Sequence, residues 1–370
     1  MDSGVNTFFE LVRAGLWETE VRLKYYEGID WVQVYKIAEE QSVVGLVAAG
    51  LEHVSDIKVP QEVALTFVGS ALQLEKRNLA MNDFIAKLIE KLRKDNISAL
   101  LVKGQGIAQC YERPLWRICG DIDLLFDEAG YRKAKKVLIK KAKSVEDEDT
   151  ERKHIGMNID QWVVELHGTM HSWCLDRMNR VVDIVQKEMF VNHSARVWRN
   201  GKSDILLPSE NNDVVFVFAH IIQHYFGTGV GLRQICDWCR LLWTYKDSLN
   251  HRLLESRIRK AGVMSEWKAF GAFAVDFLGM PVDAMPSYSS SNIWKRKARR
   301  IMKYIMKVGN MGHNRDMSYI NERPYVIRKV ISLYRSTVDG FRQFQVFPLD
   351  SVKVWSKKML IGFSKTAKGC

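Results

Sequence analysis

The segment Gly120-Asp121-Ile122-Asp123 places two carboxylates one residue apart in an apolar run that continues as Leu-Leu-Phe. In a strand, side chains at positions i and i+2 leave the same face, so Asp121 and Asp123 are expected side by side. Neighbouring carboxylates repel each other, and an apolar strand is a costly place for charge unless a cation compensates it. Mg²⁺ or Mn²⁺ suits such a pair because hard cations take oxygen ligands. The alternative interpretation is a solvated strand edge or turn.

A glycine turn lies upstream of the carboxylate pair. Residues 97–102 predict a short buried strand, which is followed by Lys103-Gly104-Gln105-Gly106 and a helix-like segment that ends at Tyr111. A glycine turn that opens a helix leaves unpaired backbone N–H groups at its start, and such groups bind phosphate readily. The order of strand, glycine turn, helix and second strand therefore predicts a phosphate site next to a metal site.

In this combination the chain resembles the nucleotidyltransferase-fold superfamily that includes DNA polymerase β, and within it a family of uncharacterised bacterial nucleotidyltransferases. The matching residues are Lys103-Gly104, Tyr111, Arg117 and the run Gly120-Asp121-Ile-Asp123-Leu-Leu. One position departs from the superfamily, which usually has Gly or Ser where this chain has Gln105. Gly106 could supply the missing flexibility, but the departure makes phosphate contacts less secure than metal contacts.

The resemblance implies a third carboxylate on a neighbouring strand, and Glu165 is the residue that fits. It lies in Trp162-Val-Val-Glu165-Leu-His167, after a predicted hairpin turn at Asp160. Alternation places Glu165 and His167 on one face. We expect Asp121, Asp123 and Glu165 to hold two divalent ions that align a triphosphate and stabilise the leaving pyrophosphate, with Glu165 as the general base.

Basic residues beside these motifs predict contacts to substrate phosphates. Lys103 follows the first strand, and Arg117 lies four residues before Asp121. Lysine acts as a point charge and arginine as a bidentate fork, so both suit phosphate. The predicted nucleotide-binding residues are Lys103, Gly104, Gln105, Gly106, Arg117 and Gly120. The competing interpretation is a solvated surface charge, since the chain has 55 Lys and Arg residues.

Five further residues are candidates for either substrate contact or a structural role: His167, His220, His224, Arg233 and Asp237. The pairs His220/His224 and Arg233/Asp237 each have a four-residue spacing, which places both members on one helical face. In the resembling family a similar His is followed by Arg and Asp, so these residues could close over a nucleotide. A buried polar network between two helices is the favoured alternative.

The elements around the motifs predict an α+β protein, with a small mixed sheet flanked by helical regions on both sides. Apolar residues at three- and four-residue intervals predict helices over most of 1–95, with Pro60 opening one helix and Asp95-Asn96 breaking another. We assign 96–200 to the nucleotidyltransferase core and 201–370 to a C-terminal helical region. Within the last region, Cys236-Asp-Trp-Cys239 lies in a helical pattern and is interpreted as helix packing.

The C-terminal region contains a basic amphipathic helix over 293–307. This segment carries seven positive charges and no negative charge, with an apolar stripe of Trp294, Ala298, Ile301, Met302 and Ile305. The stripe either packs on the helical region, lies on an anionic membrane surface, or accompanies phosphate contacts to RNA or another acidic acceptor. A net charge of +12 permits nucleic-acid binding through this region.

The composition is that of an ordinary globular protein, with 47% apolar and 26% charged residues among 370. The longest apolar runs fall well short of the ~20 residues that a membrane span needs, and the start of the chain lacks a basic signal-peptide segment. Six irregularly spaced cysteines agree with a reducing compartment. We therefore expect a cytoplasmic protein without a transmembrane segment.

Together these features favour a Mg²⁺- or Mn²⁺-dependent nucleotidyltransferase that binds ATP or another NTP. It would move the nucleoside monophosphate to an acceptor hydroxyl and release pyrophosphate, and the acceptor could be a small molecule, RNA or a protein. The alternative is a non-catalytic or regulatory module, of the RNA-binding or toxin–antitoxin type, that retains the fold. The three carboxylates argue against this alternative, because a degenerate site has no physical reason to keep them clustered.

Overall fold

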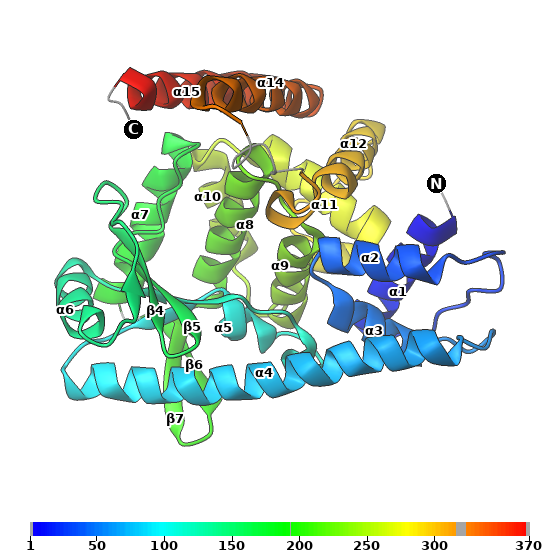
Figure 1. Ribbon diagram of the computed structural model, residues 1–370, viewed down its shortest axis with the longest axis horizontal. Coiled ribbons are helices and arrows are strands. Elements are labelled where there is room, and N and C mark those ends of the chain that lie inside the picture. The colour runs from blue at the N-terminus through cyan, green and yellow to red at the C-terminus, as the bar shows by residue number, and fades with distance from the viewer. Residues whose placement is uncertain (1–2, 193, 316–322, 368–370) are drawn as a thin grey trace.

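Helices precede the sheet, as expected for residues 1–95. In the computed structural model, which describes residues 3–192, 194–315 and 323–367, these helices are α1 (Ser3–Trp17), α2 (Trp31–Glu40), α3 (Val44–Glu52) and α4 (Gln61–Lys94). Asp30 caps α2 by accepting a hydrogen bond from the backbone N–H of Gln33. Pro60 precedes α4 and Asp95 caps its end, so the two predicted signals bound one long helix and not two. It runs across most of the width of the molecule, low in the view of Figure 1.

A five-stranded mixed sheet follows, which confirms the predicted α+β class. Its strands are β1 (Leu100–Val102), β2 (Asp121–Leu125), β3 (Ser144–Val145), β4 (His154–Ile159) and β5 (Trp162–His167). They lie in the order β1-β2-β5-β4-β3, with β2 and β5 parallel and the other pairs antiparallel. The predicted hairpin between β4 and β5 turns at Asp160, which has a positive φ of 56°.

Short helices and a second hairpin complete the middle of the chain. The helical segments are α5 (Gly104–Ala108), the 3₁₀ turn η1 (Pro114–Trp116), α6 (Glu128–Ile139) and α7 (Asp176–Val191). A separate antiparallel hairpin consists of β6 (Ala195–Asn200) and β7 (Ser203–Pro208). This hairpin crosses residue 200, where we placed the boundary between the core and the C-terminal region.

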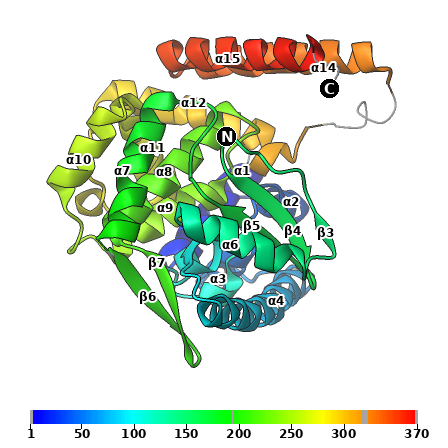
Figure 2. The same ribbon diagram turned by 90° about the vertical axis from the view of Figure 1, so that its left-hand side faces the viewer.

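The remainder is helical, as expected. Its elements are α8 (Glu210–Phe226), α9 (Leu232–Thr244), α10 (His251–Lys260), α11 (Met264–Leu278), η2 (Val282–Ala284), α12 (Asn292–Val308), η3 (Asn310–Gly312), α14 (Tyr325–Phe344) and α15 (Pro348–Ala367). Helices α7, α8 and α9 stand above the sheet, and α14 with α15 lies across the top of the molecule (Figures 1 and 2). None of the helices in the described ranges combines the length and the apolar character that a bilayer crossing requires.

The alternation within β2 separates an apolar face from a polar face. Ile122 and Leu124 pack with Met81 and Ile85 of α4 in one buried cluster. Asp121 and Asp123 therefore point to the opposite face, toward the helices above the sheet. Burial of the apolar face fixes the register, because a slip of one residue would move both carboxylates into the core.

Helix α12 confirms the predicted amphipathic helix. Ala298, Ile301, Met302 and Ile305 of the predicted stripe are buried, and Trp294 is partly buried. The stripe therefore packs on the helical region, while several of its charges are exposed. Binding of RNA or of a membrane by this charged face stays a prediction.

Candidate active site

The sheet brings the three predicted carboxylates to one face. Asp123 pairs in register with Glu165 of the parallel neighbour β5, and Asp121 pairs with Val163. Glu165 and His167 lie two residues apart on that strand, so both follow the same face as the aspartates. The clustering that the sequence predicted for Asp121, Asp123 and Glu165 thus follows from two short strands and one parallel pairing.

Asp123 is the most buried of these carboxylates and has two basic partners. The residue is 2% exposed. Lys103 donates to Asp123 Oδ1 over 2.8 Å, and His167 Nε2 lies 2.7 Å from the same oxygen. Burial alone would raise the pKa of Asp123, but Lys103 and the hydrogen bond from His167 hold it below its ordinary value. Asp123 is therefore ionised in the neutral pH range.

Asp121 has the opposite electrostatic environment. The charge of Asp123, followed by burial, raises the pKa of Asp121 above its ordinary value. The two aspartates therefore repel each other, as expected from their spacing. Lys103 stays protonated, because the charges of Asp123, Asp121 and Glu165 outweigh burial and raise its pKa. Lys103 does not cancel the repulsion between the two aspartates completely. A divalent cation would neutralise the rest.

The backbone of Lys103 is strained where it aims the amine at Asp123. Its φ is 57° with ψ at −146°, a conformation that a non-glycine residue seldom adopts. Gly104 follows with a φ of 40°, and a Cβ there would lie 3.1 Å from the Sγ of Cys119. Strain of this kind persists only where the surroundings enforce it, and it is concentrated at functional sites.

The glycine turn itself divides into residues that border the cavity and residues that do not. Lys103 and Gly104 border it. Gln105 is 1% exposed, and its amide donates to Asn78 Oδ1 on α4 over 2.8 Å. A Cβ on Gly106 would lie 2.9 Å from Leu207 of β7. Gln105 and Gly106, like Gly120, are not among the residues that line the cavity.

His154 belongs to the site but was not predicted. It pairs with His167 across the β4–β5 hairpin, and its Nε2 lies 3.1 Å from Glu165 Oε2. Burial would raise the pKa of Glu165, but hydrogen bonds from His154 and His167 together with the charge of Lys103 lower it well below its ordinary range. Ligand atoms of His154, Glu165 and His167 all lie within 4.8 Å of one another.

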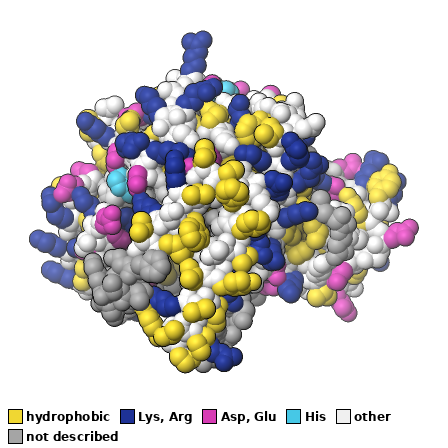
Figure 3. Space-filling model, turned by 90° about the horizontal axis from the view of Figure 1, so that it is seen from above, with side chains coloured by type: hydrophobic (Ala, Val, Ile, Leu, Met, Phe, Trp, Pro, Cys, Tyr) yellow, Lys and Arg dark blue, Asp and Glu magenta, His cyan; other side chains and the backbone are white. Residues whose placement is uncertain are grey.

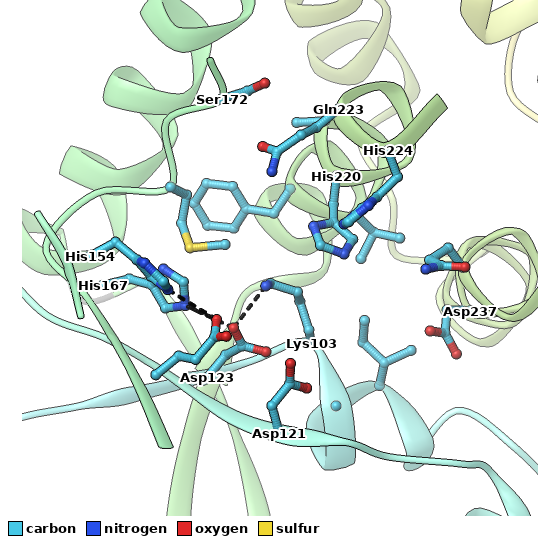
Figure 4. A pocket seen from close by; sticks show the side chains of 18 of the residues that line it. Lys103, Asp121, Asp123, His154, His167, Ser172, His220, Gln223, His224 and Asp237 are labelled. Atoms are coloured by element: carbon cyan, nitrogen blue, oxygen red, sulfur yellow. Dashed lines mark hydrogen bonds and ion pairs between the residues drawn. The ribbon is translucent and has the colours of Figure 1, made fainter. Parts of the chain in front are cut away.

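Helix α8 forms the opposite wall. His220 and His224 lie on one face, as their spacing predicted, with ring centroids 4.3 Å apart. Burial and the charge of Lys103 lower the pKa of His224 to about 4. Burial, and then the neighbouring His224, lower the pKa of His220. Both rings are therefore neutral near pH 7. Figure 4 shows His220, Gln223 and His224 projecting from α8 toward the carboxylates below.

Arg117 and Asp237 form a buried ion pair. Asp237 accepts hydrogen bonds from Arg117 Nε and Nη2 over 2.9 and 2.6 Å, and from the Tyr111 hydroxyl over 2.8 Å. The third nitrogen of Arg117 donates to the carbonyl of Ile118. Burial would lower the pKa of Arg117, but Asp237 raises it above its ordinary value. All three nitrogens of this arginine therefore have protein partners.

Arg233 is less completely paired. One of its terminal nitrogens donates to the Ile118 carbonyl over 3.0 Å, while its buried Nε has no hydrogen-bond partner in the part of the chain that the structure describes. Burial, and then the charge of Arg117, lowers the pKa of Arg233. It lines the same cavity as Lys103. The four-residue pair Arg233/Asp237 does not form, because Asp237 binds Arg117 instead.

These walls enclose a cavity of about 250 Å³ between the sheet and the helices α8 and α9. Of the predicted site residues, those that border it are Lys103, Gly104, Arg117, Asp121, Asp123, Glu165, His167, His220, His224, Arg233 and Asp237. The donor set suits a divalent cation, because the three carboxylates share one face of the cavity and His154, Glu165 and His167 bring their ligand atoms within 4.8 Å of one another. A phosphate group fits the same cavity, because Lys103 and Arg233 border it.

Comparison with known proteins identifies the relatives of this chain. No curated protein and no solved structure matches it significantly. A family model described as "uncharacterised nucleotidyltransferase" matches residues 27–279, which is more than half of the chain and includes the whole candidate site. The chain therefore belongs to this family of uncharacterised nucleotidyltransferases.

Proposed function

We propose that this protein transfers a nucleoside monophosphate from an NTP to an acceptor hydroxyl and releases pyrophosphate, with Mg²⁺ or Mn²⁺ as cofactor. The observation that supports the proposal most is the register of β2 with β5, which puts Asp121, Asp123 and Glu165 on one face of a shared cavity. The nucleotidyltransferase family of the chain agrees with this type of reaction.

In the proposed reaction, the acceptor oxygen forms a bond to the α-phosphorus while the bond from that phosphorus to the bridging oxygen of pyrophosphate breaks. The acceptor hydroxyl passes its proton to a general base, for which Glu165 is the candidate, and the electron pair of the broken bond leaves with pyrophosphate. A divalent cation held by Asp121, Asp123 and Glu165 would neutralise phosphate charge and lower the pKa of the acceptor hydroxyl.

Two cationic side chains are proposed to position the triphosphate. Lys103 presents a protonated amine beside the carboxylates, and Arg233 presents a guanidinium whose Nε has no hydrogen-bond acceptor among the described residues. A phosphate oxygen would supply the missing acceptor, and hydrogen bonds to charged groups are the strong ones. Arg117, which the sequence also suggested, is the weaker candidate because Asp237 occupies two of its nitrogens.

Glu165 has two proposed roles, cation ligand and general base. Its lowered pKa keeps it ionised, which suits a ligand. A general base works best when its pKa lies near the working pH. The ligand role therefore has the stronger physical support, and proton acceptance by Glu165 would require its hydrogen bonds from His154 and His167 to weaken.

The proposal can be tested by incubating the protein with each α-³²P-labelled NTP, Mg²⁺ or Mn²⁺, and a cell extract that supplies acceptors. The test variant is Asp121→Asn, because neutralising Asp121 removes a repulsion with Asp123 and should leave the melting temperature equal or higher. Asp160→Asn is the matched control: it makes the same chemical change at an exposed turn where asparagine tolerates the positive φ of 56°.

We expect label to enter one fraction of the extract with the wild type and with Asp160→Asn. Asp121→Asn should lose more than about a hundredfold of this activity, in line with removal of a group that stabilises transition-state charge. Titration with Mn²⁺, followed by its electron paramagnetic resonance signal, should show weaker binding to Asp121→Asn only. An Asp121→Asn protein with full activity would refute the proposed role of the carboxylates.

A further inference from the structure

Helix α14 is almost entirely unburied although it is 20 residues long. Only Asp339 and Gln343 are buried among its residues. Its exposed large apolar side chains include Val326, Val330, Leu333 and Phe341, and they continue on α15 as Leu349 and Val352. An exposed apolar surface of this extent marks an interaction site in most proteins. We therefore expect this apolar face to bind a partner.

The two helices form a surface hairpin with an apolar groove on its outer side. The groove has a volume of about 310 Å³, and Phe341, Phe344, Val352 and Trp355 provide most of its lining. Figure 3 looks down on this side of the molecule and shows hydrophobic side chains gathered in a patch, with Lys and Arg side chains beside it. Because the apolar side chains come from both helices, the hairpin presents one continuous surface.

The hairpin is attached to the body at its turn and along α15, where Lys357 pairs with Asp176 and Lys358 donates to the carbonyls of Phe226 and Gly227. Gln343 donates to the Tyr225 carbonyl over 2.7 Å and to the Tyr304 hydroxyl over 2.9 Å. Phe347 packs against aromatic rings that include Tyr225 and Phe270, and Asp350 forms an ion pair with Arg177 of α7. These contacts fix the orientation of the hairpin and leave its outer face exposed.

The exposed charge along the hairpin is positive. Residues 323–361 include eight Lys or Arg residues and two acidic residues, Asp339 and Asp350. Both aspartates are buried and ion-paired, Asp339 with Arg315 and Arg342 and Asp350 with Arg177. The exposed charges of the hairpin within these described residues are therefore basic, and Arg323, Lys329 and Lys353 are examples.

We propose that the α14–α15 hairpin docks on the surface of a membrane that contains anionic phospholipids. Exposed aliphatic and aromatic side chains flanked by Lys and Arg are the pattern by which a helix lies in the plane of a bilayer interface. The described helices do not have the length and apolar character of a membrane span, so the contact is peripheral. The acceptor and the reaction are independent of this proposal.

Two other occupants fit less well. A second copy of the chain would bring two basic faces together, and like charges across an interface oppose association. Single-stranded nucleic acid would be attracted by the charge, but it binds proteins through bases stacked on aromatic rings. Phe341, Phe344 and Trp355 offer such rings, but the exposed side chains of Val326, Val330, Leu349 and Val352 are aliphatic, and stacked bases would leave them uncovered. An anionic bilayer satisfies both the apolar and the basic part of the surface.

The test is flotation of the full-length protein with vesicles of phosphatidylcholine alone and of phosphatidylcholine with about 30% phosphatidylglycerol. The test variant is Val330→Glu/Val352→Glu, which changes one exposed residue on each helix of the hairpin; these side chains are 60% and 52% exposed. The control is Val32→Glu/Val68→Glu, with exposures of 81% and 46% on α2 and α4. Both variants add two negative charges, so they differ only in location.

We expect the wild type and the control to float with the anionic vesicles, to float much less with neutral vesicles, and to be released by high salt. The hairpin variant should lose about tenfold or more in partitioning, with an unchanged melting temperature. Wild-type protein that stays in solution with both vesicle types would overturn the proposal. Equal flotation of both variants would overturn it as well. So would a wild-type protein that binds no vesicles but forms a dimer, if Val330→Glu/Val352→Glu dissociates that dimer.

Discussion

Replacing Asp237 by asparagine tests whether Arg117 has a structural role. The change keeps the size of the side chain and removes the charge opposite a guanidinium that is 7% exposed. Asp237 itself is 4% exposed and accepts three hydrogen bonds, two from Arg117 and one from Tyr111. In the variant, the positive charge of Arg117 stays buried without a counter-ion.

The expected loss of stability follows from this geometry. Removing one partner of a buried ion pair costs about 3–5 kcal/mol, because the desolvated partner keeps its charge. For a chain of 370 residues the unfolding entropy is about 0.8 kcal/mol/K, so each kcal/mol corresponds to about 1.3 °C and the melting temperature should fall by about 4–6 °C. Mutating Arg117 to methionine together with Asp237→Asn should recover part of the loss, because the uncompensated charge is then absent.

Thermal unfolding followed by circular dichroism measures the effect, and Asp204→Asn is the matched control. Asp204 pairs with Arg199 on the β6–β7 hairpin, where the side chains are 49% and 70% exposed. An exposed pair contributes about 0–1 kcal/mol, so this control should melt close to the wild type. An Asp237→Asn protein that melts like the wild type but has lost nucleotidyl transfer would refute the structural assignment and return Arg117 to the substrate.

Two more predictions concern groups that are buried without full compensation. Arg233→Gln should leave the melting temperature equal or higher, because burial lowers the pKa of Arg233 and thus disfavours its charge. If a phosphate group binds Arg233, the variant should also raise the KM for NTP by about tenfold or more. An unchanged KM would contradict this role. Burial and Asp350 raise the pKa of Glu266 to about 8, so its contribution to stability is complete below pH 4.5 and is lost as the pH rises through 8. The Glu266→Gln variant should therefore have a higher melting temperature than the wild type at pH 8.5 but not at pH 4.5. A difference in melting temperature between the two proteins that is the same at both pH values would contradict the raised pKa of Glu266.

The carboxylates could be predicted from sequence because local patterns determine their placement. Alternation in an apolar strand decides the face of Asp121 and Asp123, and the turn at Asp160 fixes the hairpin that carries Glu165. The same turn would have identified His154, since the pairing of Ile159 with Trp162 also sets His154 opposite His167. This signal was present in the sequence and was not used.

The partners of Arg117 and Gln105 could not be predicted, because they come from distant parts of the chain. Asp237 lies 120 residues from Arg117, and Asn78 lies 27 residues from Gln105. Spacing within a helix placed Asp237 on the same face as Arg233, but its partner in the fold is the guanidinium of Arg117. The side chain of Gln105 binds Asn78 of α4, a contact that no local pattern encodes.

The charges in the cavity explain why a strained lysine is placed at its centre. Asp121, Asp123 and Glu165 supply three negative charges, and Lys103 and His167 are the basic groups in direct contact with Asp123. Without Lys103, Asp123 would be a 2%-exposed carboxylate beside a second aspartate, and burial of that kind is costly. The positive φ of Lys103 keeps the amine at this position, so the folded chain tolerates the carboxylates before any cation is bound. Since the lysine compensates Asp123 more than Asp121, the remaining excess of negative charge is the part of the site that a cation would neutralise.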